Sequence, residues 1–308
     1  MNWTRRQWMG VAAAAALPAQ SASAARPQKI ALFSKPLHFL RGEALVAAVA
    51  DAGFDAIDIT VRKDGHVEPA AAAAELPTLV TLARKKGLDV PMVTSGILDA
   101  TTRGLEDFVR LLADLGIHYY RWDGFQYDPS RPFPPQLDDF RRRSTALATL
   151  NARHGVMAIY HTHSGMPYAS ASIVSLREMF RDADPRGVGV NYDVAHATIE
   201  GGLGGWIQSF RLCQDRIHGI AVKDFVWSLK SPGDWSVQWT PLGDGMVHLR
   251  EFARMLRDSG FDGPIQVHAE YPLGGAENGR RDITMPAADI IAALKRDCAV
   301  LRAALSEA

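Results

Sequence analysis

The sequence predicts an α/β protein built as a single (β/α)8 barrel. Short segments rich in β-branched and aromatic residues recur along the chain, and longer segments with apolar residues at spacings of three and four separate them. About eight such strand–helix pairs follow one another without a polar linker. The chain has 308 residues and barrels of about 250 residues form one domain, so the length fits one barrel better than two smaller domains.

The expected strands lie at regular intervals along the chain. They cover residues 29–34, 56–60, 90–94, 118–122, 156–161, 188–193, 217–223 and 265–270. Glycine precedes several of them, as expected where a helix ends and a turn leads into the next strand; these glycines are Gly53, Gly116, Gly155, Gly187 and Gly263. No glycine-rich nucleotide-binding motif follows an early strand, so neither a dinucleotide site nor a P-loop is expected.

Residues 1–24 predict a secretory signal peptide rather than a part of the barrel. Arg5 and Arg6 precede a short apolar run, and Ala22-Ser23-Ala24 has the small residues of a cleavage site. The paired arginines resemble the twin-arginine (Tat) type, and the apolar run is too short to span a bilayer. We therefore expect cleavage after Ala24, a mature barrel of residues 25–308 in the periplasm, and no membrane attachment after cleavage.

The charge balance excludes several classes of partner. Lysine and arginine number 34 and aspartate and glutamate also 34, so the formal net charge is zero. A nucleic-acid surface or a polybasic membrane anchor would need a basic excess. The chain has only two cysteines, Cys213 and Cys298, too few for a disulfide framework.

Polar and charged residues cluster where the expected strands end. In a (β/α)8 barrel these ends and the loops after them form the active site. The residues so placed are Lys35, His38, Asp58, Arg62, His66, Thr94, Asp123, His161, His163, Asp193, His196, Lys223, Asp224 and Glu270. Any one of them has an ordinary structural explanation, but repetition over at least four units predicts a shared pocket.

The residue types predict metal-assisted proton transfer. Carboxylates and imidazoles are ligands for a divalent ion such as Mn, Zn, Co or Mg, and the candidate ligands are His161, His163, Asp193 and Glu270. Glu270 is also the candidate base for a proton next to a carbonyl group, and Lys223 could stabilise the enediolate oxygen. A surface ion pair of Lys223 with Asp224 remains an equal alternative.

Several segments resemble motifs of the xylose isomerase-like TIM barrels, the sugar phosphate isomerase/epimerase and endonuclease IV superfamily. Residues 53–59, GFDAIDI, are similar to "GFDGVDL" of the second strand. Residues 160–163, YHTH, resemble "YHNH" of the fifth strand, and residues 192–196, YDVAH, resemble "YDxGH" of the sixth. Val222-Lys223-Asp224 is similar to the end of "HxHLKD", and residues 241–245, PLGDG, to "PLGxG". The resemblance covers residues 29–303.

The resemblance implies a divalent ion held by Asp193, Glu270 and a fifth-strand residue. Isomerases and epimerases of the family place a catalytic glutamate on that strand, and the matching residue here is His161, which implies a catalytic role for His161. The family's seventh-strand histidine ligand corresponds to Ala221. His163 or His196 could restore a ligand, or the barrel could bind a sugar without metal; His196 matches a substrate-contacting position. The other expected substrate-binding residues are Lys35, His38, Asp58, Arg62, His66 and Asp224.

Three functions follow from these observations. The leading one is an isomerase or epimerase that acts on a small carbohydrate or sugar-derived carbonyl compound through an enediolate. The second is a lyase or dehydratase that expels a leaving group from a 3-keto-glycoside or an inosose-like substrate. The third is a non-catalytic carbohydrate-binding barrel. Nucleic acid is not expected as a partner, a homo-oligomer is compatible with the sequence, and the long segment 224–245 could serve as a lid or a subunit contact.

Overall fold

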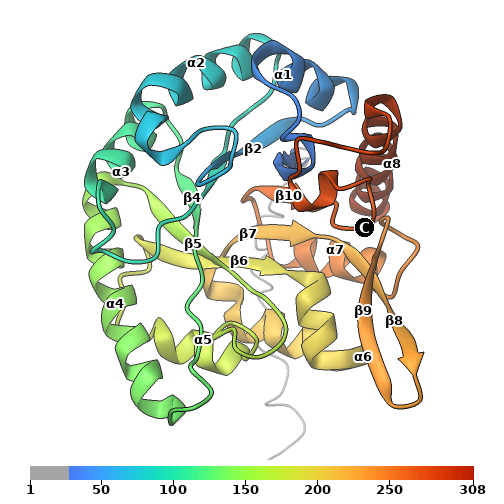
Figure 1. Cartoon of the computed structure of the whole chain (residues 1–308). Coiled ribbons are helices and arrows are strands. Elements are labelled where there is room, and N and C mark those ends of the chain that lie inside the picture. The colour runs from blue at the N-terminus through green and yellow to red at the C-terminus, as the bar shows by residue number, and fades with distance from the viewer. Residues whose placement is uncertain (1–27) are drawn as a thin grey trace, which may run out of the picture.

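The computed structural model describes residues 28–308 and confirms the single barrel (Figure 1). Eight parallel strands close on themselves in the order β1-β10-β7-β6-β5-β4-β3-β2. Their bounds are β1 (Ile30–Phe33), β2 (Ala56–Val61), β3 (Met92–Ser95), β4 (Tyr119–Trp122), β5 (Met157–His161), β6 (Val188–Asp193), β7 (Ile217–Val222) and β10 (Ile265–Val267). The proposed signal segment 1–24 lies outside the described residues.

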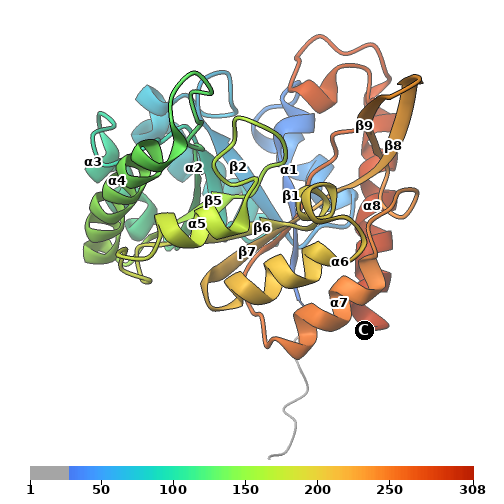
Figure 2. The same ribbon diagram turned by 90° about the horizontal axis from the view of Figure 1, so that it is seen from below.

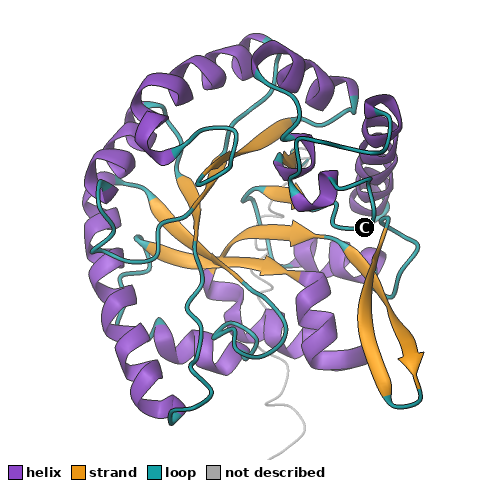
Figure 3. Cartoon of the chain, viewed as in Figure 1, coloured by secondary structure: helices purple, strands orange, loops and turns teal. Residues whose placement is uncertain are grey.

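Within residues 28–308, eight α-helices surround the strands (Figures 2 and 3). They are α1 (Gly42–Asp51), α2 (Ala72–Lys85), α3 (Leu105–Asp114), α4 (Phe133–His154), α5 (Ile173–Met179), α6 (Val194–Cys213), α7 (Leu249–Asp258) and α8 (Ala287–Ser306). On α3, Leu105, Val109 and Leu112 are buried, which is the apolar stripe expected from their spacing. Among the described helices, none is long and apolar enough to cross a membrane.

Polar side chains occupy part of the barrel interior. Asn191 on β6 is fully buried, and its amide bonds with that of Gln266 on β10. Gly219 on the intervening strand β7 makes room for it, because a Cβ there would lie 2.8 Å from Asn191 Oδ1. The absence of a side chain at Gly219 thus lets a polar layer form below the strand ends.

The segment expected as a long loop, 224–245, contains a β-hairpin instead. Strands β8 (Asp224–Ser231) and β9 (Asp234–Thr240) pair antiparallel, with Trp227 opposite Val237 and Leu229 opposite Trp235. Gly233, with φ near +83°, provides the left-handed turn. The aromatic residues of this segment therefore belong to a two-stranded ribbon that projects from the barrel (Figures 1 and 2).

Candidate active site

Three side chains from β5, β6 and the end of β10 meet inside the barrel mouth. His161 and Asp193 end their strands, and His268 directly follows β10. His161 Nε2 lies 3.3 Å from Asp193 Oδ2, and the rings of His161 and His268 stack with centroids 5.0 Å apart. Each residue offers one ligand atom within 4.8 Å of the others, and all three are buried. We call them the His–Asp–His centre.

The His–Asp–His centre fits a divalent metal ion. His161 Nε2, Asp193 Oδ2 and His268 Nδ1 are buried and have no hydrogen-bond partner among the described residues. Leaving such atoms unsatisfied is costly, and a cation would satisfy all three. Asp193 Oδ1 is fixed separately, because it accepts hydrogen bonds from the backbone N–H groups of Ala195 and His196 at the start of α6.

Electrostatics keep the imidazoles neutral, as metal binding requires. Burial and then the positive charge of Arg121 hold the pKa of His161 well below its usual range. Burial and then Lys223 do the same to the pKa of His268. Burial raises the pKa of Asp193, although Lys223 opposes this shift.

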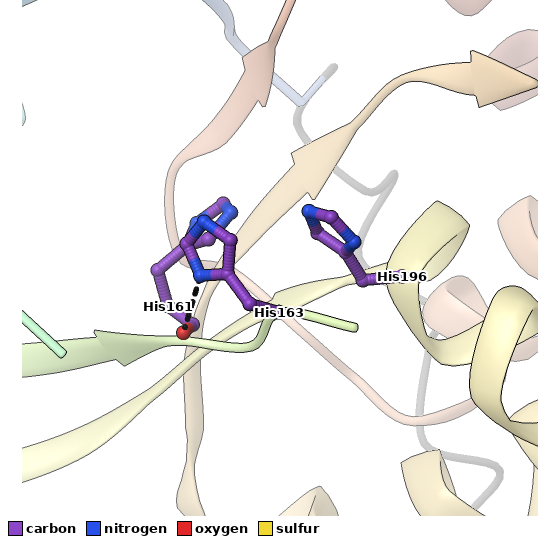
Figure 4. Close-up of side chains that lie close together, drawn as sticks. All are labelled: His161, His163 and His196. Carbon is purple, nitrogen blue, oxygen red and sulfur yellow. Dashed lines mark hydrogen bonds between the residues drawn. The ribbon is translucent and has the colours of Figure 1, made fainter. Parts of the chain in front are cut away.

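A second group of imidazoles shares His161 (Figure 4). His163 and His196 also place ring nitrogens within 4.8 Å of each other and of His161. His163 Nδ1 faces the carbonyl oxygen of His161 at 3.3 Å, and His196 Nδ1 lies 2.7 Å from Ser164 Oγ. The sequence-predicted ligands His161, His163 and Asp193 are therefore neighbours.

Glu270 lies between two lysines. Its Oε2 is 2.8 Å from Lys223 Nζ, and its Oε1 is 3.3 Å from Lys35 Nζ. Lys223 Nζ also lies 3.4 Å from Asp193 Oδ2, so close contacts run from the His–Asp–His centre to Glu270. Burial disfavours the charge on Glu270, but Lys223 and Lys35 outweigh it and hold its pKa well below the usual range. Glu270, the fourth ligand expected from the sequence, lies outside both histidine groups, and its two oxygens are paired with ammonium groups.

The β8–β9 hairpin contributes one aromatic wall. The ring of Trp239 lies 4.3 Å from Lys223 Nζ and 5.3 Å from the ring of His196. A cation over an aromatic face is attracted by it. The hairpin therefore helps to fix Lys223, whereas Trp227 and Trp235 farther along it are exposed.

Comparison with known proteins agrees with this geometry. The family model described as "Xylose isomerase-like TIM barrel" matches residues 46–295. The chain belongs to this family.

Relatives of the chain include both epimerases and dehydratases. Inosose dehydratase of Lacticaseibacillus casei is 29% identical over 152 residues, which are 43% of this chain and 48% of that protein, so the match spans about half the relative's length. D-psicose 3-epimerase of Clostridium cellulolyticum H10, solved with D-tagatose, has a TM-score of 0.65 at 15% identity over 90% of this chain and 99% of its own. A probable 3-DHS dehydratase of Bacillus anthracis has a TM-score of 0.65 at 16% identity over 88% and 99%. At these identities the two structures establish the fold.

Members of the xylose isomerase-like family commonly use divalent metals and process sugars. Ala221 stands where the resemblance implies a seventh-strand histidine, and it lies between Asp193 and Gln266 in the sheet register. His268, which directly follows the neighbouring strand β10, offers an imidazole to the His–Asp–His centre. Sequence reasoning missed His268, although it precedes Glu270 by two residues and therefore has the same side-chain direction expected along a strand.

His38 and His66 form a separate buried pair. Their rings meet edge to face, with centroids 4.8 Å apart. His38 bonds through Nε2 to Thr60 Oγ1 at 2.9 Å, and His66 bonds through Nε2 to the carbonyl oxygen of Ser34 at 3.1 Å. Burial lowers the pKa of His38 to about 4 and that of His66 to about 3. The structure does not bring this pair into contact with the His–Asp–His centre.

Asp224 is occupied by backbone hydrogen bonds. Its carboxylate accepts the N–H groups of Phe225, Gly243, Gly245 and Val247 at 2.9–3.1 Å. A Cβ on Gly245 would lie 2.1 Å from Asp224 Oδ1, so glycine is required for this approach. The carboxylate thus closes the base of the hairpin. Its four backbone hydrogen bonds explain why an aspartate stands here, without the expected substrate contact or a surface ion pair with Lys223.

Asp58 lies inside the barrel on β2. Its Oδ2 accepts a hydrogen bond from Thr94 Oγ1 at 2.8 Å, and Oδ1 has no partner among the described residues. Burial raises the pKa of Asp58 to about 7. Arg62 lies at the end of the same strand, close to Arg121 of β4, a residue that sequence reasoning also missed.

Proposed function

We propose that the chain is an enzyme that removes a proton next to the carbonyl group of a small sugar-derived substrate and then expels a leaving group. The observation that carries this proposal is the position of Glu270 between Lys223 and Lys35. One carboxylate and two ammonium groups supply a base, a partner for the developing oxyanion and a proton donor.

The proposed elimination conserves protons. Glu270 takes the proton from the carbon next to the carbonyl group, and Lys223 stabilises the resulting enolate oxygen. The enolate electrons form a carbon–carbon double bond as the β-oxygen leaves, and Lys35 gives that oxygen its proton, which releases water or an alcohol. Glu270 then returns its proton to Lys35 across their 3.3 Å contact.

The charges of the site suit this sequence. Burial lowers the pKa of Lys35, with Glu270 opposing, so its ammonium group is a better proton donor than an exposed lysine. Glu270 is a weak base while both lysines face it. Its basicity increases when Lys223 turns towards the substrate oxygen, so proton removal is coupled to stabilisation of the enolate.

The His–Asp–His centre would hold the divalent ion. Bound there, the ion would supply Lewis acidity towards a carbonyl or hydroxyl oxygen of the substrate. Trp239 and the imidazoles of His163 and His196 would line the same space and exclude water from it.

Epimerisation is the second candidate, favoured by the position of His163. It offers a ring nitrogen within 4.8 Å of those of His161 and His196, and an imidazole is the side chain that most often exchanges protons with a substrate. Elimination is preferred, because His161 stands where epimerases of the family have a second carboxylate.

Incubation with carbonyl substrates in deuterium oxide tests both candidates. An inosose, a 3-keto-glucoside and a ketohexose form a suitable panel. Elimination produces a conjugated enone with ultraviolet absorbance and loss of water or alcohol by mass, whereas epimerisation gives a deuterated diastereomer. Absence of exchange and elimination with every compound would reject the enzyme, and sugar binding without turnover would favour the non-catalytic barrel.

We also propose that the protein is exported to the periplasm. Residues 1–24, outside the described part of the chain, have the paired arginines, apolar run and cleavage site that support export. Periplasmic substrates are more often glycosides than phosphorylated intermediates, which agrees with elimination from a glycoside.

A further inference from the structure

Three cationic side chains surround one buried aromatic ring at the barrel mouth. Lys35 Nζ, Arg62 Cζ and Arg121 Cζ lie 5.8, 5.7 and 5.8 Å from the centroid of the Phe33 ring. The same ring stacks on His268 with centroids 4.4 Å apart. The three cations therefore lie beside the His–Asp–His centre, within reach of a substrate bound there.

The two arginines lack carboxylate partners. Among residues 28–308, no carboxylate oxygen lies within 4.0 Å of Arg62 or Arg121, and neither guanidinium makes a hydrogen bond. The acidic groups nearest to them are Asp58, Asp123 and Glu270, and none of these forms an ion pair with either arginine. Asp58 is bonded to Thr94 with its pKa raised to about 7 by burial, and Asp123 is exposed at the rim.

An unpaired arginine pair in this position is unfavourable without a ligand. Both guanidinium groups are partly buried. Burial and then the charge of Arg62 lower the pKa of Arg121. Both desolvation and repulsion between the two guanidinium groups therefore disfavour the charged form of Arg121. Glu270 does not pair with the arginines, because its two oxygens already face Lys35 and Lys223. An oxyanion would relieve both costs, since a guanidinium binds carboxylate and phosphate with paired, charge-assisted hydrogen bonds.

We propose that Arg62 and Arg121 form an anion subsite and that the substrate is an acidic sugar derivative carrying a carboxylate or a phosphate group. The inference rests on the proposed function for the choice of a sugar as the carrier. The anion would anchor one end of the substrate, while Glu270 and the His–Asp–His centre address its carbonyl group. A hollow of about 830 Å³ lies beside Arg62 and is lined also by Arg103 and Asp123, so an anion could reach Arg62 from this side.

Calorimetric titration of the metal-free protein with three matched sugars tests the subsite. The ligands are D-glucose, D-glucuronate and D-glucose 6-phosphate. We expect at least one anionic ligand to bind about tenfold or more tightly than glucose, with an affinity that falls as salt is added. The preferred ligand shows whether the anion is a carboxylate or a phosphate.

Arginine variants separate this subsite from general charge. Arg121→Gln and Arg62→Gln should each remove most of the preference, and Arg121→Lys should keep only part of it because the planar fork is lost. Arg110→Gln is the control, since Arg110 is an exposed arginine of α3 whose ion-pair partner is Asp107. Circular dichroism checks that each variant is folded.

The inference is overturned by any of three results: equal affinity for the three ligands, no binding of either anionic ligand at millimolar concentration, or a preference that survives both glutamine substitutions. These measurements need neither metal nor turnover. A protein that binds D-glucuronate through Arg121 but eliminates nothing would keep the subsite and reject the proposed enzyme.

Discussion

Lys223 and Glu270 form an ion pair of 2.8 Å between the ends of two neighbouring strands, β7 and β10. The Lys223 side chain is 3% exposed and that of Glu270 22%, so the lysine is buried and the carboxylate opens towards the mouth. Burying a charge pair is costly and contributes little to stability on balance. Its position beside the candidate metal ligands of the His–Asp–His centre supports the proposed proton transfer rather than a packing role.

Replacing Glu270 by Gln should remove activity and preserve the fold. The amide keeps the size of the side chain but cannot accept the substrate proton, and loss of a general base lowers rates by about 10²–10⁴-fold. Steady-state rates on the substrate identified by exchange, together with a thermal unfolding curve, measure both effects. Glu251→Gln on the exposed face of α7 is the control. Wild-type rates in Glu270→Gln would contradict the assignment.

Metal binding should depend on His268. We expect the wild-type protein to bind one divalent ion, and His268→Gln to lose at least about tenfold in affinity because one of three ligands is gone. An ion at about 100 times its dissociation constant should add about 2.7 kcal/mol to the free energy of unfolding. Elemental analysis and unfolding with and without chelator measure this. His218→Gln, on β7 beside Tyr119, is the control. Equal metal content in both variants would reject the centre.

The sequence was sufficient to predict the barrel, because eight apolar segments and their helical partners recur at barrel spacing. It also pointed to His161, Asp193, Lys223 and Glu270, since each stands at the end of an apolar strand, and the structure brings these four side chains together. His268 was missed although the expected strand 265–270 contains it, because nothing in that short apolar pattern distinguished an inward histidine from a core one.

The limits of strand-end reasoning are clearest at Asp224. It stands at a strand end like Asp193, yet loop residues about 20 positions later capture its carboxylate. The sequence did not reveal the β8–β9 hairpin for a related reason. Trp227 and Trp235 are exposed, so no buried face marks this segment as a pair of strands. The contact of Trp239 with Lys223 shows where the hairpin lies.

Export should require the paired arginines. Changing Arg5 and Arg6 together to lysine keeps the charge but removes the feature read by the twin-arginine pathway. We expect the precursor to remain in the cytoplasm with residues 1–24 attached. Fractionation and N-terminal sequencing measure this, with Arg110→Lys as a control. Processed protein in the periplasm from the double variant would refute the Tat assignment.

Stability should depend on pH through Asp58. Its ordinary pKa of 3.8 rises to about 7 in the folded state, so between these values the folded protein binds more protons than the unfolded chain. The free energy of unfolding must therefore fall as pH rises from about 4 to 7. The rise of the pKa from 3.8 to about 7 corresponds to roughly 4 kcal/mol.

Asp58→Asn should remove this contribution, because asparagine does not titrate. Relative to the wild type, the variant should become more stable as pH rises, with the difference growing by up to roughly 4 kcal/mol between pH 4 and pH 8. Urea unfolding of both proteins across this range measures it. Parallel stability profiles would show that Asp58 ionises in the folded state as easily as in the unfolded chain.

Asp224 should act through stability rather than substrate binding. Asp224→Ala leaves four backbone N–H groups at the base of the hairpin without their acceptor, and each buried unsatisfied donor costs about 1–3 kcal/mol. We expect a loss of several kcal/mol in the free energy of unfolding. Asp244→Ala tests the same loop at an exposed position, where the carboxylate pairs with Arg296, and should cost less than about 1 kcal/mol. If Asp224→Ala instead retains wild-type stability and weakens sugar binding, the four hydrogen bonds are dispensable and Asp224 contacts the substrate, as its place at the end of an apolar strand first indicated.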